Sequence, residues 1–197
     1  MTRWGGRADM PAFDPLDPDF ESAVRASFDR LTLMRTIGAR LEGVSAGEVE
    51  IVLPFRDDLT QHHGFMAAAV LTAVVDVACG YAAMTLMPPG SSVLTVEYKA
   101  NFLAPAQGER MVARGRVIRP GRTITVCAGD VVAVDRGTEK PVATLLATMM
   151  RIAGDRLPSP VETKALDHQP LAHRRQSRRW CLCRAWNRHR RHVTAPV

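Results

Sequence analysis

Residues 65–87, FMAAAVLTAVVDVACGYAAMTLM, decide the fold, because this stretch is apolar on every side except for one carboxylate, Asp76. Pro88-Pro89-Gly90 ends it. A helix that is apolar all round is buried, either in a lipid bilayer or inside a protein. The stretch is rich in Ala, and a central carboxylate costs roughly 2.5–3.5 kcal/mol on membrane-insertion scales. We therefore expect a helix buried in protein, with no membrane partner.

Alternating apolar and polar residues on both sides of this helix indicate β-strands. Val49, Ile51 and Leu53 share one face of a strand over residues 48–53, and Pro54 stops it. Pro- and Gly-containing turns separate four further alternating segments after the helix. These predicted strands span about residues 92–102, 109–118, 122–134 and 141–152.

An amphipathic helix is predicted before the first strand. Asp17 is the expected N-cap, Pro18 the first helical residue, and apolar residues recur at helical spacing to about Thr36, before Gly38. The elements together predict an α+β fold in which a curled antiparallel sheet wraps one long central helix. Two such sheets can join edge to edge in a dimer, which covers their exposed edge strands.

The basic character of the chain comes from its C-terminal segment. Residues 168–197 contain eight Arg and no Asp or Glu, and the whole chain has a net charge of +6, so residues 1–167 carry −2. This segment also contains two Trp, Trp180 and Trp186, which could suggest nucleic-acid binding, but it lacks Gly, acidic residues and any apolar period. We therefore expect a non-functional tail and no nucleic-acid partner. The predicted organisation is a disordered N-terminus (1–17), one domain (18–153) and a basic, disordered and dispensable tail (154–197).

Cysteine usage and the N-terminal residues predict a cytoplasmic protein, and the spacing of its potential metal ligands does not predict a metal site. The four Cys lie in unrelated contexts, and the first residues contain no apolar signal segment. Some tail residues are potential zinc ligands, but the loop between the pairs is far shorter than in a zinc finger. They are Cys181, Cys183, His189 and His192.

Asp76 is the strongest candidate for a functional group. It is the only charged residue between Asp58 and Glu97. A lone buried carboxylate is costly unless it is paired or functional, and the structural alternative is a hydrogen bond to a neighbouring group. The composition around Asp76 leaves both readings open.

The start of the same helix could supply an anion-binding group. The loop TQHHGF (60–65) leads into it, so the backbone N–H groups near Ala67 and Ala68 should be unpaired. The positive pole of the helix dipole lies at this end. Such amides could stabilise a carbonyl oxygen as it becomes an oxyanion.

Several motifs together resemble the phenylacetyl-CoA (PaaI-type) thioesterases of the hotdog superfamily. They are LTQHHGF (59–65), Asp76 with GYAA (80–83), VEYKANFLAPA (96–106) and GRVIRPGRT (115–123). The resemblance extends over about residues 20–152 and implies a hotdog fold.

The resemblance also implies hydrolysis of an acyl-CoA thioester without a cofactor. Asp76 would attack the carbonyl or activate the attacking water, and Gln61 would orient water and thioester. The amide of Ala68 would form the oxyanion hole, and His63 and Gly64, with Ala67, would contact the substrate. The two halves of such a site come from different subunits, so the family resemblance implies a homodimer or a dimer of dimers.

This chain departs from the family pattern at the start of the helix, where Ala67 and Ala69 replace a His and a Gly. The alternative function is therefore a non-catalytic acyl-CoA-binding hotdog module. A hotdog hydratase is a weaker alternative, because the His-containing hydratase segment is not evident.

A turn between two predicted strands carries Arg119, Arg122 and Thr123. Arg suits the phosphate groups of CoA, so Arg122 and Thr123 are candidate substrate-binding residues. The alternative is that these strand-end side chains are simply solvated.

Overall fold

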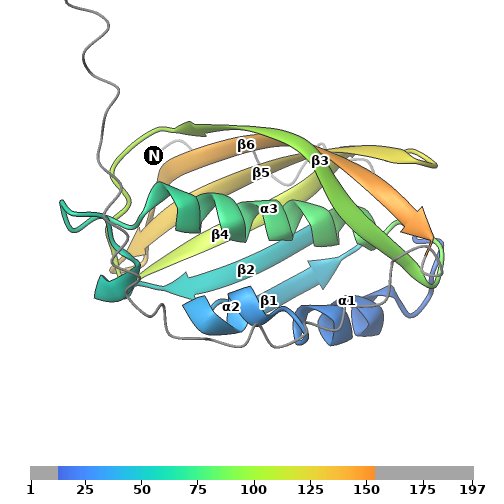
Figure 1. Cartoon of the computed structure of the whole chain (residues 1–197), viewed down its shortest axis with the longest axis horizontal. Helices are drawn as coiled ribbons and strands as arrows, with labels where there is room; N and C mark the ends of the chain where they lie inside the picture. Colours follow the sequence, from blue (N-terminus) through green and yellow to red (C-terminus); the bar gives the residue numbers. More distant parts are fainter. Residues whose placement is uncertain (1–12, 154–197) are drawn as a thin grey trace, which may run out of the picture. The chain divides into compact units, whose positions relative to one another are not determined.

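In the computed structural model, which describes residues 13–153, a six-stranded antiparallel sheet packs around one long helix (Figure 1). The strand order is β1-β2-β4-β5-β6-β3. The strands are β1 (Arg40–Ser45), β2 (Glu48–Pro54), β3 (Ser91–Phe102), β4 (Arg110–Arg119), β5 (Ile124–Asp135) and β6 (Thr138–Ala153). The helices are α1 (Phe20–Phe28), α2 (Thr32–Ile37), a short 3₁₀ turn (Asp57–Leu59) and α3 (Ala68–Met84). This arrangement is the predicted α+β hotdog fold.

The long helix α3 is apolar all round because it contacts β2, β3, β4, β5 and β6. Its backbone lies so close to β4 that a Cβ on Gly115 would come within 2.4 Å of the carbonyl oxygen of Ala78. Only glycine fits there. Among the described residues, no helix is long and apolar enough to cross a membrane.

The strands predicted after the central helix are confirmed, with small shifts at their ends. The single helix predicted from Asp17 to Thr36 is wrong, because a turn ends α1 after Phe28 and α2 begins at Thr32. Asp17 does not cap α1 directly; its carboxylate accepts the N–H of Asp19 at 3.0 Å. Strand β1 was missed, since a register shift next to Gly43 interrupts its alternation.

Ordered packing begins before the predicted domain start at residue 18. The ring of Phe13 packs against the core and lies beside Gly47. The predictions for residues 1–12 and for the tail, 154–197, lie outside the described residues. The division of the chain into domain and tail stays a prediction.

Candidate active site

Asp76 lies in the middle of α3 as a half-buried carboxylate. Its Oδ1 accepts a hydrogen bond from Oγ1 of Thr95 at 2.9 Å. Burial raises the pKa of Asp76, while the bond from Thr95 opposes that shift. No Lys or Arg among the described residues forms an ion pair with this carboxylate. Asp76 is therefore a carboxylate of raised pKa for which no ion pair is found among the described residues, and such a group can accept a proton.

Thr95 belongs to the site and was missed by the sequence reasoning. Its cross-strand partner on β6 is Met149, whose side chain is fully buried, so Thr95 lies on the helix-facing side of the sheet. The register shifts between Thr95 and Glu97, which makes Val96 an extra residue. A bulge changes the face on which later residues lie. Alternation alone therefore could not reveal which polar residue of β3 faces Asp76.

The loop before α3 holds Gln61 in one conformation. The N–H of Gln61 donates to the carbonyl of Phe65 at 2.8 Å, and the N–H of Gly64 donates to the carbonyl of Gln61 at 2.9 Å. Gly64 has φ 80°, a value that favours glycine. Oε1 of Gln61 accepts the N–H of His63 at 2.5 Å, which leaves the side-chain NH₂ as a donor.

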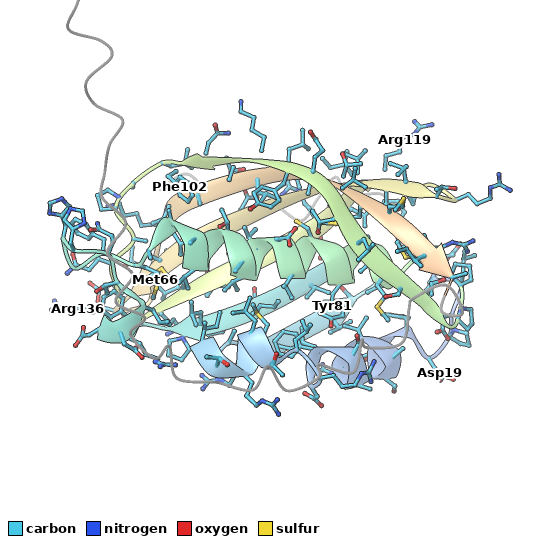
Figure 2. The ribbon with its side chains drawn as sticks, viewed as in Figure 1. Asp19, Met66, Tyr81, Phe102, Arg119 and Arg136 are labelled. Atoms are coloured by element: carbon cyan, nitrogen blue, oxygen red, sulfur yellow. The ribbon has the colours of Figure 1, made fainter. Side chains whose placement is uncertain are left out.

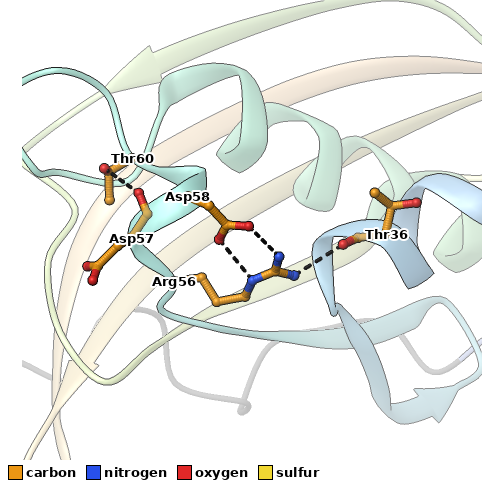
Figure 3. Close-up of polar contacts among 5 residues, drawn as sticks. All are labelled: Thr36, Arg56, Asp57, Asp58 and Thr60. Atoms are coloured by element: carbon orange, nitrogen blue, oxygen red, sulfur yellow. Dashed lines mark hydrogen bonds and ion pairs between the residues drawn. The ribbon is translucent and has the colours of Figure 1, made fainter.

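Hydrogen bonds of Arg56 connect the residues before this loop to α2 (Figure 3). The guanidinium of Arg56 donates to both carboxylate oxygens of Asp58, at 3.0 and 2.6 Å, and to the carbonyl of Thr36 at 3.1 Å. These bonds from Arg56 lower the pKa of Asp58. Oγ1 of Thr60, the residue before Gln61, donates to the carbonyl of Asp57 at 2.7 Å.

At the start of α3, the backbone N–H of Ala68 is available to a ligand, whereas that of Ala67 is not. The N–H of Met66 donates to Ala106 at 2.9 Å, and that of Ala67 donates to Leu59 at 3.0 Å. The prediction that the Ala67 amide is unpaired is therefore wrong, because the incoming chain pairs with the 3₁₀ turn. Within residues 13–153, the amides of Ala68 and Ala69 donate to no backbone carbonyl.

Gln61 and Ala68 line one open, mostly apolar cleft of about 220 Å³. It lies at the end of the sheet where Figure 2 labels Met66 and Phe102. The apolar residues of its floor and walls are Phe65, Met66, Leu71, Phe102, Ala104, Pro105 and Ala106. An apolar cleft with one polar corner suits a ligand that has a carbonyl group on an apolar body.

One chain does not bring all predicted site residues together. Asp76 follows Ala68 by eight residues on α3, which is about 12 Å along the helix axis. The β4–β5 turn with Arg122 and Thr123 follows Arg119, which lies at the opposite end of the sheet from Met66 (Figure 2).

His63 contributes its backbone N–H to the loop, while its side chain is exposed and its ring lies 3.9 Å from that of His62. In the described part of the chain, no group of three or more His, Cys, Asp or Glu side chains could hold a metal ion.

Comparisons with known proteins identify the family. The family model described as "Thioesterase superfamily" matches residues 63–140. A thioesterase family protein from Silicibacter pomeroyi is 46% identical in sequence; the match covers 68% of this chain and 99% of that structure, with a TM-score of 0.67. The chain therefore belongs to the thioesterase superfamily.

Two further proteins are similar to this chain. The Escherichia coli PaaI protein of the phenylacetic acid degradation operon has a TM-score of 0.63 at 18% identity, over 71% of this chain and 97% of that structure. At this identity the likeness supports the PaaI-type hotdog fold alone. A Halobacterium salinarum protein provisionally named an esterase is 27% identical over 128 residues, or 62% of this chain and 83% of its relative.

Proposed function

We propose that residues 18–153 form a thioesterase domain that hydrolyses acyl-CoA thioesters, with Asp76 as its working carboxylate. The observation that carries the proposal is the half-buried Asp76, which has a raised pKa and an oriented hydrogen bond from Thr95 but no cationic partner in the described structure. A structural carboxylate is normally neutralised by a cation or by several donors. Asp76 has one side-chain donor and remains able to accept a proton.

The reaction assigns one task to each group. Asp76 accepts a proton from water as the water oxygen bonds to the thioester carbon, or its own oxygen makes that bond. The N–H of Ala68 and the NH₂ of Gln61 stabilise the negative charge on the carbonyl oxygen. The C–S bond then breaks and the sulfur takes up a proton, from protonated Asp76 if water attacked or from solvent if Asp76 attacked. In the second route, water then hydrolyses the anhydride between the acyl group and Asp76, so both routes release free acid and CoA. No metal or cofactor is needed for these steps.

The proposed site requires two chains. Hydrogen bonds of about 3 Å on either side of one carbonyl group do not span the roughly 12 Å from Ala68 to Asp76. Ala68 and Gln61 of one protomer would therefore act with Asp76 of its partner.

The edge of β3 is the surface that suits this pairing. This strand has 12 residues and ends the sheet, so its outer backbone groups have no strand partner among residues 13–153. Val96 and Tyr98, with about half of their side-chain surface exposed, lie on the same strand as Thr95. A second copy paired along β3 would cover them and bring its own helix start towards Asp76.

Arg122 and Thr123 are proposed contacts for the phosphate groups of CoA. Both residues are exposed at the β4–β5 turn, and no ion pair is found for Arg122 in the described structure. Because this turn follows Arg119, at the opposite end of the sheet from Met66 (Figure 2), the proposed CoA would cross from one protomer to the other.

A thiol-release assay with acetyl-, hexanoyl-, benzoyl- and hexadecanoyl-CoA tests the activity. Wild-type protein should release CoA from at least one of them, and Asp76→Asn should lower kcat by about 10²–10⁴-fold. Wild-type turnover by a folded Asp76→Asn protein would make Asp76 structural and end the proposed mechanism.

Mixing two inactive variants tests whether the site is shared. A hybrid of Asp76→Asn and Gln61→Ala chains contains one intact site if the site spans two protomers. Half of randomly re-formed dimers are hybrids, so the mixture should recover about a quarter of wild-type activity. Each variant mixed with itself is the control, and a mixture as inactive as its parents would place each site within one chain.

Ala67 and Ala69 keep one alternative open, a hotdog module that binds acyl-CoA without cleaving it. Such a protein would bind the same substrates and release no thiol, so the assay separates the two functions. The free amide of Ala68 favours catalysis, because a backbone N–H remains available whatever the neighbouring side chains are.

A further inference from the structure

The carbonyl of Leu59 determines which amide at the start of α3 is free. It accepts the N–H of Ala67 at 3.0 Å, so the N–H of Ala68 is the first in the helix that donates to no backbone carbonyl in the described part of the chain. Leu59 is the last residue of the 3₁₀ turn, Asp57–Leu59. Because neighbouring amides of one chain move together, the position of this turn bears on the direction of the Ala68 N–H.

Burial does little to hold the 3₁₀ turn in place. Asp57 and Asp58 are exposed, and Leu59 is only half-buried. The N–H of Leu59 donates to the carbonyl of Arg56 at 3.1 Å, and that of Thr60 donates to Asp57 at 3.2 Å. These two bonds close the turn on itself and do not attach it to another element. A segment with so few buried contacts depends on other hydrogen bonds for a fixed position.

Arg56 supplies a connection from the turn to a buried element (Figure 3). Its guanidinium donates to both carboxylate oxygens of Asp58 and to the carbonyl of Thr36, near the end of α2. The helix α2 is itself fixed in the core, where Met34 and Ile37 are buried. A guanidinium that makes two bonds to one carboxylate has a defined orientation, unlike a single surface ion pair.

We propose that Arg56 is a positioning residue of the active site: its bonds fix the 3₁₀ turn relative to α2 and thereby orient the N–H of Ala68 towards the thioester carbonyl oxygen. The inference rests on the proposed function for the group that is positioned. Arg56 acts through the turn and takes no part in the bond changes. An exposed ion pair contributes little to the free energy of unfolding, so its loss should affect the rate far more than the stability.

Substituting Arg56 and comparing kcat, KM and the melting temperature tests the proposal. Arg56→Gln should lower kcat by about 10–100-fold with little change in KM, because a displaced oxyanion donor weakens binding of the transition state alone. Arg56→Lys keeps the charge but not the paired bonds, so it should lower kcat nearly as much. Arg25→Gln is the matched control: Arg25 donates through two nitrogens to Glu21 on α1, and its loss should leave kcat unchanged. A fall in kcat that only matches the loss of folded protein would overturn the proposal.

The pH profile distinguishes positioning of the amide from an effect on the carboxylate. The bonds from Arg56 lower the pKa of Asp58, so this pair stays intact over the acid range in which Asp76, whose pKa is raised, takes up a proton. Arg56→Gln should therefore lower the plateau of kcat/KM and leave the acid limb at the pH of the wild type. A shifted acid limb would mean that Arg56 acts on Asp76 and would overturn the proposal.

Amide hydrogen exchange separates failure of this proposal from failure of the proposed function. In Arg56→Gln protein the N–H of Ala67 should exchange about tenfold faster by NMR, because the turn that carries its acceptor has lost a connection to α2. The N–H of Met66 donates to Ala106 at 2.9 Å and is the internal control, which should not change. Unchanged exchange at Ala67, or wild-type kcat in folded Arg56→Gln protein, would overturn the positioning role. A wild type that releases no thiol would overturn the hydrolase function, while faster exchange at Ala67 would still support the connection from Arg56 to the helix start.

Discussion

Replacing Thr95 by Val separates the positioning of Asp76 from its chemistry. The two side chains have nearly the same shape, but Val cannot donate the 2.9 Å hydrogen bond to Oδ1 of Asp76. That bond stabilises the ionised carboxylate and opposes the effect of burial on its pKa. Without it, the pKa of Asp76 should rise further, and a larger share of the protein should be protonated and inactive in weak acid.

The size of the effect follows from the exposure of the donor. A hydrogen bond to a charged group contributes about 1.5–3 kcal/mol, and Thr95 is exposed in the single chain, so the lower end applies. About 1.4 kcal/mol corresponds to a tenfold change in the protonation equilibrium. Thr95→Val should therefore lower kcat/KM about tenfold on the acid side of the pH profile and much less on its plateau.

The assay is the pH dependence of kcat/KM for wild type, Thr95→Val and a control, Thr148→Val. Thr148 lies on β6 opposite Glu97, on the sheet face away from α3, and does not contact Asp76. Its substitution should leave the profile unchanged. If the acid limbs of Thr95→Val and wild type coincide, the hydrogen bond does not tune Asp76, and Thr95 has no positioning role.

Three further predictions concern the helix and its carboxylate. The pKa of Asp76 is raised in the folded state, so its ionisation lowers the free energy of unfolding as pH rises from the ordinary value of 3.8 through the folded pKa. Asp76→Asn should therefore have a higher melting temperature than wild type at pH 7, and this difference should vanish below pH 3.8. The double change Ala67→His and Ala69→Gly should raise kcat/KM in the thiol-release assay. It should also slightly lower the melting temperature, since Gly in a helix costs roughly 0.5–1 kcal/mol relative to Ala. A lower kcat/KM in a folded double variant would contradict this prediction. Gly115→Ala should lower the free energy of unfolding in urea by about 1–3 kcal/mol, because the new Cβ meets the backbone of α3. Gly129→Ala should lower it less, because there the Cβ meets only the side-chain atoms of Val75 and Cys79 at under 3 Å. Equal losses in the two variants would mean that the helix backbone can move away from β4.

The fold was largely predictable because its strongest signals are local. The apolar stretch around Asp76 and the alternating strands after it report burial through residue type alone, and the structure places them as expected. The wrong predictions arose where local backbone geometry interrupts the regular spacing of apolar residues along the chain. The turn after Phe28 divides a helix, and the irregularity near Gly43 conceals β1.

The candidate site, like the fold, was predictable from the sequence only in part. The sequence by itself determined that one lone carboxylate, Asp76, lies in an apolar helix, and that a polar loop containing Gln61 precedes it. Only the tertiary structure decided that Ala68, and not Ala67, keeps a free amide, since Leu59 takes the other. It likewise decided that Thr95 reaches Asp76, because a bulge on an edge strand sets which residues face the helix. Hydrogen-bond partners and strand register depend on contacts between distant segments, and no periodicity within one segment contains them.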